Sequence, residues 1–553
     1  MRTAATLKAH RGYGDGSYGL LPRYAGHPLA YLFTCAFLLV LAYLVPAAFL
    51  WNNCDLVAYS VPLTLLCFAA AGGAAYGLYR LFLLLCGTRF LQRRTLWVAL
   101  FFAALLLLQA VLAHSVYYQP GWDVSILTEG GYWLAHDKGM VDPAYFRQYP
   151  NNVPLLMVWA YVSKLLFALG GTDFLFAEIM LCTAAINAAV FFVYLLADRF
   201  CGAPVALTAA ALCVPFLCLA PWIVIPYSDT ATLLFPVLAF WLWCRADDAP
   251  GLRARILWYL GAGLVVGIGY SLKPTVFIVC IAFALADLLG ARPAHAGSGA
   301  AAAAAPLRER LFCLGAMLAV VFVLMAGSSF LCRRVLYASG VTEADLDRYA
   351  FPATHFFNMG LSESISPVSG GTVYGKWYGD DVLLAGDAPT HADKVQATLH
   401  AAGEKLRAMG PLGYLSYLNR KVRWFMGDGT MYFGGEALIY DCFQQGAPAR
   451  LLQQFWWRGG QYYWVTAHIL QGLWMLCVFL CALPVLLRRD SYAARHLLAL
   501  RFCVCGIMLF IALFEGRSRY LTNFLPLFVL LAAVSAAAVC KPKQNAPEHV
   551  AKP

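Results

Sequence analysis

Charged side chains are scarce in this sequence: they make up 12% of its 553 residues, whereas hydrophobic residues make up 61%. A soluble domain of this size could not bury so much apolar surface, so the composition excludes a soluble globular protein and indicates a multi-pass membrane protein. A CxxC pair, the usual spacing of a cysteine metal site, is also missing. Most of the 18 cysteines lie within apolar segments, where they act as small hydrophobic side chains.

Acidic residues are outnumbered by basic ones, 29 to 40, which gives a formal net charge of +11. This surplus could indicate nucleic-acid binding, but the basic residues gather in short loops that alternate with apolar segments. That is the positive-inside pattern, so we expect membrane lipids and no nucleic acid as partners, a plasma-membrane location and two cytoplasmic termini. Lys273, Arg517 and Arg519 break the pattern, because they fall in short loops on the outer side.

Apolar runs of about 20 residues predict about twelve membrane crossings. We place them at residues 29–50, 60–86, 96–114, 174–197, 203–221, 229–244, 256–272, 274–290, 311–331, 462–487, 497–514 and 520–540. Residues 154–169 look like a further crossing, but counting them would move the later basic loops outside. We therefore expect a helix that lies at the interface or re-enters the membrane. The predicted fold class is an all-α polytopic membrane protein.

The long loops divide the predicted chain into four parts. Residues 1–95 would form an N-terminal cytoplasmic tail and two additional crossings, and residues 96–331 a transmembrane core with a large first outer loop at 115–173. Residues 332–461 are enough for a small domain on the outer face. Residues 462–553 would hold the last crossings and a cytoplasmic tail.

Acids and aromatic residues are concentrated in the first outer loop. Asp123 lies about nine residues beyond the third predicted crossing. A carboxylate there would sit near the outer interface, where it could take a proton from an acceptor hydroxyl. The alternative is a solvated loop acid or a helix cap. Glu129, in the same loop, is a candidate for orienting an acceptor.

Two further turns carry a charged residue at the outer end of a predicted crossing. Asp229 follows the sequence PWIVIPYS, and it could cap the next helix or act as a second acid that orients an acceptor or a bound divalent cation. Lys273 stands in SLKPT, where it could extend to lipid phosphates or hold a substrate phosphate.

The sequence EGRSRY, residues 515–520, lies between the last two predicted crossings. Arg517 and Arg519 favour phosphate binding, because a guanidinium can contact a phosphate through two hydrogen bonds. An internal salt bridge with Glu515 is the alternative.

Asp345 and Asp347 form a DxD pair, but the sequence TEADLDRY is typical of a capped amphipathic helix. We therefore assign no metal site, and no cofactor beyond the divalent cation considered above.

Several of these features occur together in one known class of proteins. The chain resembles the GT-C superfamily of integral-membrane glycosyltransferases, above all the bacterial relatives of protein O-mannosyltransferases and of the aminoarabinose transferase of lipid A. The resemblance rests on the loop acid Asp123, the sequence YPNNVPLLMVW, the turn ADRFCG, the turns that contain Asp229 and Lys273, and the late EGRSRY. It runs from about the third crossing to the end of the chain.

The resemblance implies a sugar donor linked to a polyprenyl phosphate, an acceptor hydroxyl on the outer face and inversion at the anomeric carbon. Asp123 would match the catalytic acid of the loop, and Lys273, Arg517 and Arg519 would be candidates for the donor phosphate. Asp123 stands in GWDVS and not in an acidic pair, so an envelope glycan or a lipid is as good an acceptor as a protein. The rival interpretation is a lipid-linked glycan flippase, for which repeats and charges at mid-membrane would be expected.

Overall fold

The computed structural model describes residues 28–540 except 52–53, 55, 87, 89–91, 291–305, 367–368, 435–441 and 487–494. The predicted basic tails before residue 28 and after residue 540 lie outside this range. Within it the chain is almost entirely helical, and its one sheet is the two-stranded antiparallel pair β1 (Glu363–Ile365) and β2 (Thr372–Tyr374). The predicted all-α fold class is confirmed.

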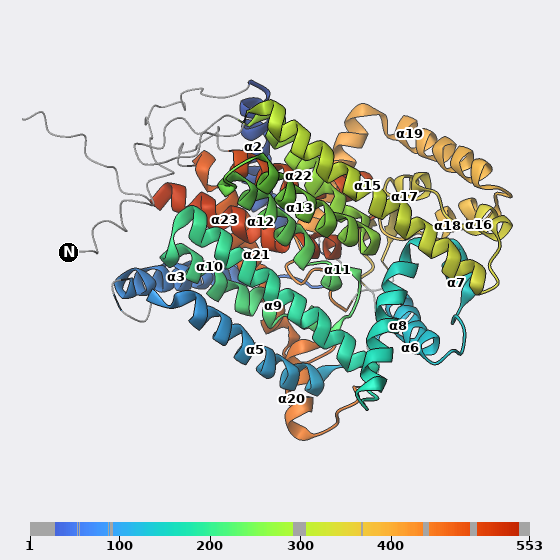
Figure 1. Cartoon of the computed structure of the whole chain (residues 1–553), viewed down its shortest axis with the longest axis horizontal. Coiled ribbons are helices and arrows are strands. Elements are labelled where there is room, and N and C mark those ends of the chain that lie inside the picture. The colour runs from blue at the N-terminus through green and yellow to red at the C-terminus, as the bar shows by residue number, and fades with distance from the viewer. Residues whose placement is uncertain are drawn as a thin grey trace, which may run out of the picture.

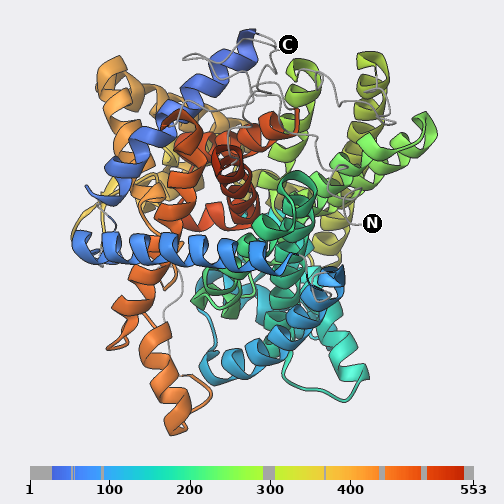
Figure 2. The ribbon, with the colours of Figure 1, turned by 90° about the vertical axis from the view of Figure 1, so that its left-hand side faces the viewer.

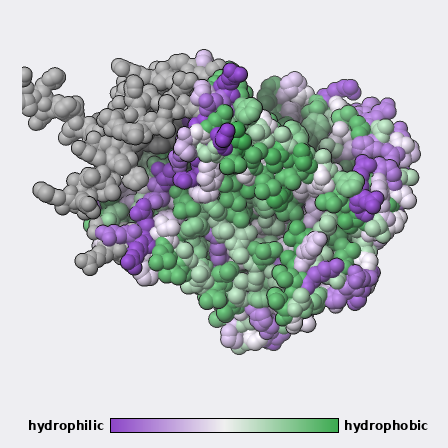
Figure 3. Space-filling view, viewed as in Figure 1, coloured by the Kyte–Doolittle hydropathy of each residue, from purple (hydrophilic) through white to green (hydrophobic). Residues whose placement is uncertain are grey.

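In the described part of the chain, nine helical segments are long and apolar enough to cross a membrane. They are α2 (Pro28–Phe49), α3 (Val61–Leu85), α5 (Arg94–Val116), α9 (Phe174–Cys201), α13 (Leu252–Leu272), α15 (Leu307–Ala338), α21 (Tyr463–Leu486), α22 (Arg495–Leu513), and the 3-10 segment η6 (Ser518–Phe524) with α23 (Leu525–Cys540). Apolar side chains cover the middle of the face in Figure 3, and hydrophilic ones gather at its right-hand end. The count of twelve crossings stays a prediction.

The remaining predicted crossings are short or interrupted. They are α10 (Ala203–Cys213) with the π-helical η2 (Val214–Cys218), α12 (Leu234–Arg245), and the 3-10 segment η5 (Pro274–Phe277) with α14 (Ile278–Leu289). Between η2 and α12 the chain forms η3 (Pro221–Val224) and the four-residue α11 (Ser228–Ala231), and η4 (Ala246–Asp248) follows α12. Proline in the first turn starts α10 and η5, because it needs no hydrogen-bond partner there.

The last helices form the centre of the bundle. Helix α21 packs against α2, α3 and α23, and α23 packs also against α9. Figures 1 and 2 show these late helices, in orange to red, enclosed by the blue and green helices of the first half. The end of the sequence therefore contributes to the same core as its beginning, and η6 is held firmly at one end of that core.

The first outer loop folds into α6 (Trp122–Ala135), α7 (Pro143–Gln148), η1 (Pro150–Asn152) and α8 (Val153–Ala168). Helices α6 and α8 pack closely, since a Cβ atom on Gly131 would come within 2.6 Å of the Cβ of Trp159. The predicted helix over residues 154–169 is therefore present. Its position relative to a membrane stays a prediction.

The outer segment after α15 contains α16 (Glu343–Tyr349), α17 (Ala353–Met359), the two strands, α18 (Gly379–Asp387), α19 (His391–Met426) and α20 (Ala447–Trp456). Helices α17 and α18 pack on α19, and Figure 1 shows this group at one end of the bundle. We call residues 339–434, within the predicted outer-face segment 332–461, the outer domain; its side of the membrane stays a prediction. Thr342 and Asp345 form a capping box at the start of α16, and Asp345 lies 3.8 Å from Arg147. The DxD pair is thus part of a helix start, as its sequence indicated.

Candidate active site

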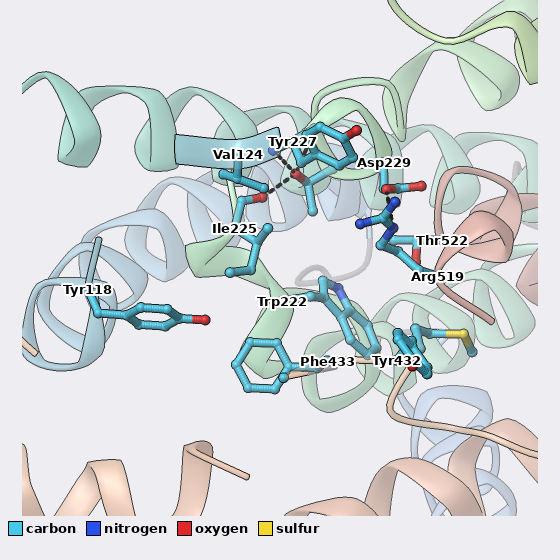
Figure 4. A pocket seen from close by; sticks show the side chains of 13 residues that line it. Tyr118, Val124, Trp222, Ile225, Tyr227, Asp229, Tyr432, Phe433, Arg519 and Thr522 are labelled. Atoms are coloured by element: carbon cyan, nitrogen blue, oxygen red, sulfur yellow. Dashed lines mark hydrogen bonds and ion pairs between the residues drawn. The ribbon is translucent and has the colours of Figure 1, made fainter. Parts of the chain in front are cut away.

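A pocket lies where the first outer loop, the chain between η2 and α12, the end of the outer domain and η6 meet (Figure 4). Its lining residues are Tyr118 and Val124; Trp222, Ile225, Tyr227, Asp229 and Thr230; Met431, Tyr432, Phe433 and Gly434; and Arg519 and Thr522. In Figure 4, Asp229 faces Arg519 at one side of the pocket, and Tyr118 lies at the other. The pocket therefore combines a charged side with an aromatic side.

Asp123 is the second residue of α6, two positions after the cap residue Gly121. A carboxylate at this position interacts favourably with the positive end of the helix dipole. The hydroxyl of Tyr227 donates a hydrogen bond of 3.0 Å to Asp123 Oδ2. Asp123 is partly exposed, whereas Tyr227 is buried and lines the pocket. The loop acid is therefore joined to the pocket through one tyrosine.

Two further tyrosines from the first outer loop lie near the same carboxylate. Burial raises the pKa of Tyr145 and Tyr149, and the charge of Asp123 raises both further. Both phenols stay protonated at neutral pH and can act only as uncharged hydrogen-bonding groups.

Asp229 is the centre of a buried ion cluster. Its carboxylate forms a salt bridge with Lys273, and the Nε of Arg519 lies 3.1 Å from its other oxygen. Only 3% of Asp229 and 7% of Lys273 are exposed. The cap position of α11 belongs to Tyr227, so Asp229 pairs with two cations instead of capping the helix. Lys273 likewise contacts Asp229 instead of extending to a lipid headgroup.

The turn before η6 adds a second acid and a second guanidinium. Glu515 accepts a hydrogen bond of 2.8 Å from the hydroxyl of Tyr520 and lies 3.7 Å from Arg517. Burial raises the pKa of Glu515 above its ordinary value, against the opposing effect of the nearby Arg519. The ring of Tyr520 also lies 4.7 Å from the Lys273 ammonium, which links this turn to the Asp229 cluster. The predicted phosphate residues Lys273, Arg517 and Arg519 thus lie in one neighbourhood, and the salt bridge with Glu515 exists beside them.

The aromatic side of the pocket offers two polar atoms that no described residue binds. The hydroxyl of Tyr118 and the Nε1 of Trp222 are buried and have no hydrogen-bond partner among the described residues. A buried donor without a partner costs about 1–3 kcal/mol, and functional sites are among the places where such groups persist. Both residues line the pocket, so a bound molecule with hydroxyl or ether oxygens could satisfy them. The sequence gives no local signal that marks these two aromatics out from the many others.

Backbone strain is concentrated around the site. Among the described non-glycine residues, positive φ angles occur at Trp122, Asp137, Asp142, Met431 and Tyr432. The first three belong to the outer loop that carries Asp123, and the last two line the pocket. This conformation is costly for residues such as Trp, Met and Tyr, and it persists where the surrounding structure fixes it.

Asp428 is the residue that fixes the strained loop at Met431 and Tyr432. It accepts hydrogen bonds from the backbone N–H groups of Thr430 and Tyr432, and from the hydroxyl of Ser518.

Glu129 lies one to two helical turns after Asp123 on α6. It accepts hydrogen bonds from Gln119 at 3.1 Å and from Ser125 at 3.2 Å, and it is not among the residues that line the pocket. Its predicted role in orienting an acceptor stays a prediction. Asp381, which follows Asp380 at the start of α18, is buried and bound to Lys405 at 2.7 Å. Among the residues that the structure describes, no three His, Cys, Asp or Glu side chains gather as a metal site would require.

Comparison with known proteins gives one family and a few solved structures. The model of a family described as conserved hypothetical integral membrane protein matches residues 32–540. No curated protein matches the sequence. The chain is similar to the crystal structure of ArnT from Cupriavidus metallidurans bound to undecaprenyl phosphate. The identity is 14% and the TM-score 0.33, over 80% of this chain and 78% of that one.

Two structures from Archaeoglobus fulgidus are also similar. One is the oligosaccharyltransferase AglB in complex with an inhibitory peptide and a dolichol-phosphate, with 13% identity, a TM-score of 0.31, and coverage of 83% of this chain and 59% of that one. The other is an oligosaccharyltransferase tethered to an acceptor peptide, with 12% identity, a TM-score of 0.27, and coverage of 80% and 56%. This chain thus spans less than two thirds of either. All three TM-scores are below 0.5, so the function is judged from the site.

Proposed function

The chain belongs to the family of conserved hypothetical integral membrane proteins, and we propose that it is an inverting glycosyltransferase of the plasma membrane. In this proposal it moves a sugar from a polyprenyl-phosphate donor to an acceptor hydroxyl on the outer face. The acceptor is an envelope glycan, a lipid or a protein. The observation that carries the proposal is the convergence of Lys273, Arg517 and Arg519 beside Asp123 and an aromatic pocket.

The basic residues suit the phosphate of the donor. Lys273 and Arg519 share the single carboxylate of Asp229, so this buried group carries one positive charge more than it carries negative charge. A phosphodiester brings one negative charge, which would balance the group. Arg519 and Arg517 can each offer two parallel N–H donors to phosphate oxygens, and Lys273 offers a point charge.

Asp123 suits the role of general base. Its carboxylate would accept the proton of the acceptor hydroxyl while the acceptor oxygen attacks the anomeric carbon. The bond between that carbon and the phosphate oxygen breaks, and the polyprenyl phosphate leaves with the bonding electrons. Since the phosphate is already a good leaving group when cations balance its charge, no strong general acid is needed. The hydrogen bond from Tyr227 would hold Asp123 in place during this step.

The aromatic side of the pocket suits the transferred sugar. A sugar ring has apolar C–H faces that can pack on Trp222 and Phe433, and it has oxygens that can accept hydrogen bonds from Tyr118 and Trp222. The strained loop that presents Met431 and Tyr432 would keep this wall in place before the donor binds.

The test is a turnover assay with the purified protein and a panel of polyprenyl-phosphate sugars. Release of the polyprenyl phosphate, together with a glycosylated acceptor, is the expected result. The same protein in vesicles can be tested for movement of the donor between leaflets. Movement of the lipid without cleavage of the sugar–phosphate bond would contradict the proposal and favour the flippase.

A further inference from the structure

The turn that carries Glu515 and Arg517 is bound on its outer side by the outer domain. The N–H of Glu515 donates to the carbonyl of Phe356 at 2.7 Å, and the N–H of Gly516 donates to the carbonyl of Gly375 at 2.9 Å. Ser518, at the start of η6, donates to Asp428 at 2.8 Å. A turn between two helices of the bundle is thus fixed by backbone contacts with a different part of the chain.

Lys421, near the end of α19, completes this connection from inside. Its ammonium donates to the carbonyls of Gly360 and Phe514, each at 2.7 Å. The first carbonyl belongs to the outer domain and the second to the residue directly before Glu515. The side chain is fully buried, at 0% exposure. Gly375 leaves the room for it, because a Cβ atom there would overlap the Lys421 ammonium.

A buried lysine is costly, so its presence at this position needs a compensating interaction. Burial lowers the pKa of Lys421 to about 7, against the opposing effect of the nearby charge of Glu515. A leucine or methionine would fill the same space without that cost, but it could not bind two carbonyls from separate segments. The ammonium therefore offers a connection between segments that apolar packing would not.

We infer that Lys421 is a positioning residue, through which the outer domain fixes Glu515 and Arg517 for the donor phosphate. This inference rests on the proposed function. It gives the outer domain a role within the transfer reaction. Residues more than 90 positions before the turn would determine where the guanidinium of Arg517 lies. Loss of one charge-assisted hydrogen bond between Arg517 and the phosphate weakens binding about tenfold or more, so a loosened turn should raise the donor KM.

Lys394 provides a control in the other half of α19, before the kink at Gly410. It is equally buried, at 0% exposure, and it also donates to two backbone carbonyls, those of Asp347 and Arg348. Its partners lie within the outer domain and not on the turn before η6. Lys394→Met and Lys421→Met should therefore both lower the thermal stability, while only the second acts on the site.

The experiment measures the thermal unfolding midpoint, the donor KM and the kcat for both variants. We expect Lys421→Met to raise the donor KM about tenfold or more, and Lys394→Met to leave it within about twofold. Ser518→Ala removes the separate hydrogen bond to Asp428 and should also raise the donor KM. This variant tests the inference if Lys421→Met does not fold.

An equal donor KM in Lys421→Met and Lys394→Met would overturn the inference, and so would an unchanged donor KM in Ser518→Ala. Either result would leave the proposed function standing. Wild-type protein that neither transfers sugar nor binds polyprenyl phosphate would instead overturn the proposed function, and the inference with it.

Discussion

Replacement of Asp229 by asparagine should leave two buried cations without their shared carboxylate. Lys273 binds one oxygen of Asp229, and Arg519 lies 3.1 Å from the other. Removal of one partner from a buried ion pair costs about 3–5 kcal/mol, because a charge is left uncompensated. We expect Asp229→Asn to lower the free energy of unfolding by about that amount when no ligand is present.

An anionic ligand should restore part of this loss. If the phosphate of the donor binds beside Lys273 and Arg519, polyprenyl phosphate binds Asp229→Asn more tightly than it binds wild type, because more positive charge is available. A ligand at a hundred times its dissociation constant returns about 2.7 kcal/mol to the folded state. The assay is thermal unfolding of the purified protein in detergent, with and without polyprenyl phosphate.

Asp381→Asn is the control for this experiment. Asp381 is also buried and pairs with Lys405 at 2.7 Å, but it lies in the outer domain away from the pocket. It should lose stability without any gain specific to polyprenyl phosphate. If the lipid phosphate stabilises Asp381→Asn as much as Asp229→Asn, or Asp229→Asn no more than wild type, the phosphate does not bind at this cluster.

Asp123→Asn should lower kcat by about 100-fold or more while donor binding and the unfolding midpoint stay unchanged, since only the proton acceptor is lost; normal transfer would exclude Asp123 as the base. Arg517→Lys should weaken donor binding about ten- to a hundredfold in a donor titration, because lysine keeps the charge but loses the paired contact; unchanged donor affinity with reduced stability would leave Arg517 only its salt bridge. Tyr118→Phe should weaken binding of the sugar-bearing donor about two- to tenfold and leave binding of polyprenyl phosphate alone unchanged; equal effects on both ligands would remove Tyr118 from the sugar site. Burial lowers the pKa of His355 to about 4, below its unfolded value of about 6.5. Between these pH values the folded state binds fewer protons than the unfolded state. The free energy of unfolding should therefore fall by about 3 kcal/mol as the pH falls from 6.5 to 4. The unfolding midpoint of His355→Gln should fall less over this range, and an identical fall would show that another group is responsible.

The separate segments of the site were predictable because each has a local cause. An acid in a loop just after an apolar helix stands out in the sequence. So do basic residues in loops that the charge pattern assigns to the outer side. Neither signal needs any knowledge of contacts. Asp123, Lys273, Arg517 and Arg519 stand out in this way, and their roles stay predictions. Glu129 was selected on the same grounds, but its hydrogen bonds are to Gln119 and Ser125.

The pairing of these segments could not be predicted. Tyr227 contacts Asp123 across 104 positions, and Lys273 contacts Asp229 across 44. No local pattern distinguishes an acid that caps a helix from one that holds two cations, because the difference lies in which distant turn packs against it. Asp229 fits both descriptions in the sequence, and only its place between η5 and η6 decides between them.

Composition alone determined that this protein belongs in a membrane, because apolar surface of this extent cannot be hidden in water. Charge placement distinguished the loops that hold Lys273, Arg517 and Arg519 from the other outer loops. The tertiary structure decided that an aromatic pocket exists between those loops, with the backbone at Met431 and Tyr432 strained to form its wall. The physical reason is that hydrophobicity and charge act residue by residue along the chain. A pocket and its strain arise only when the packing of distant segments compensates for local conformations that no short sequence would adopt alone.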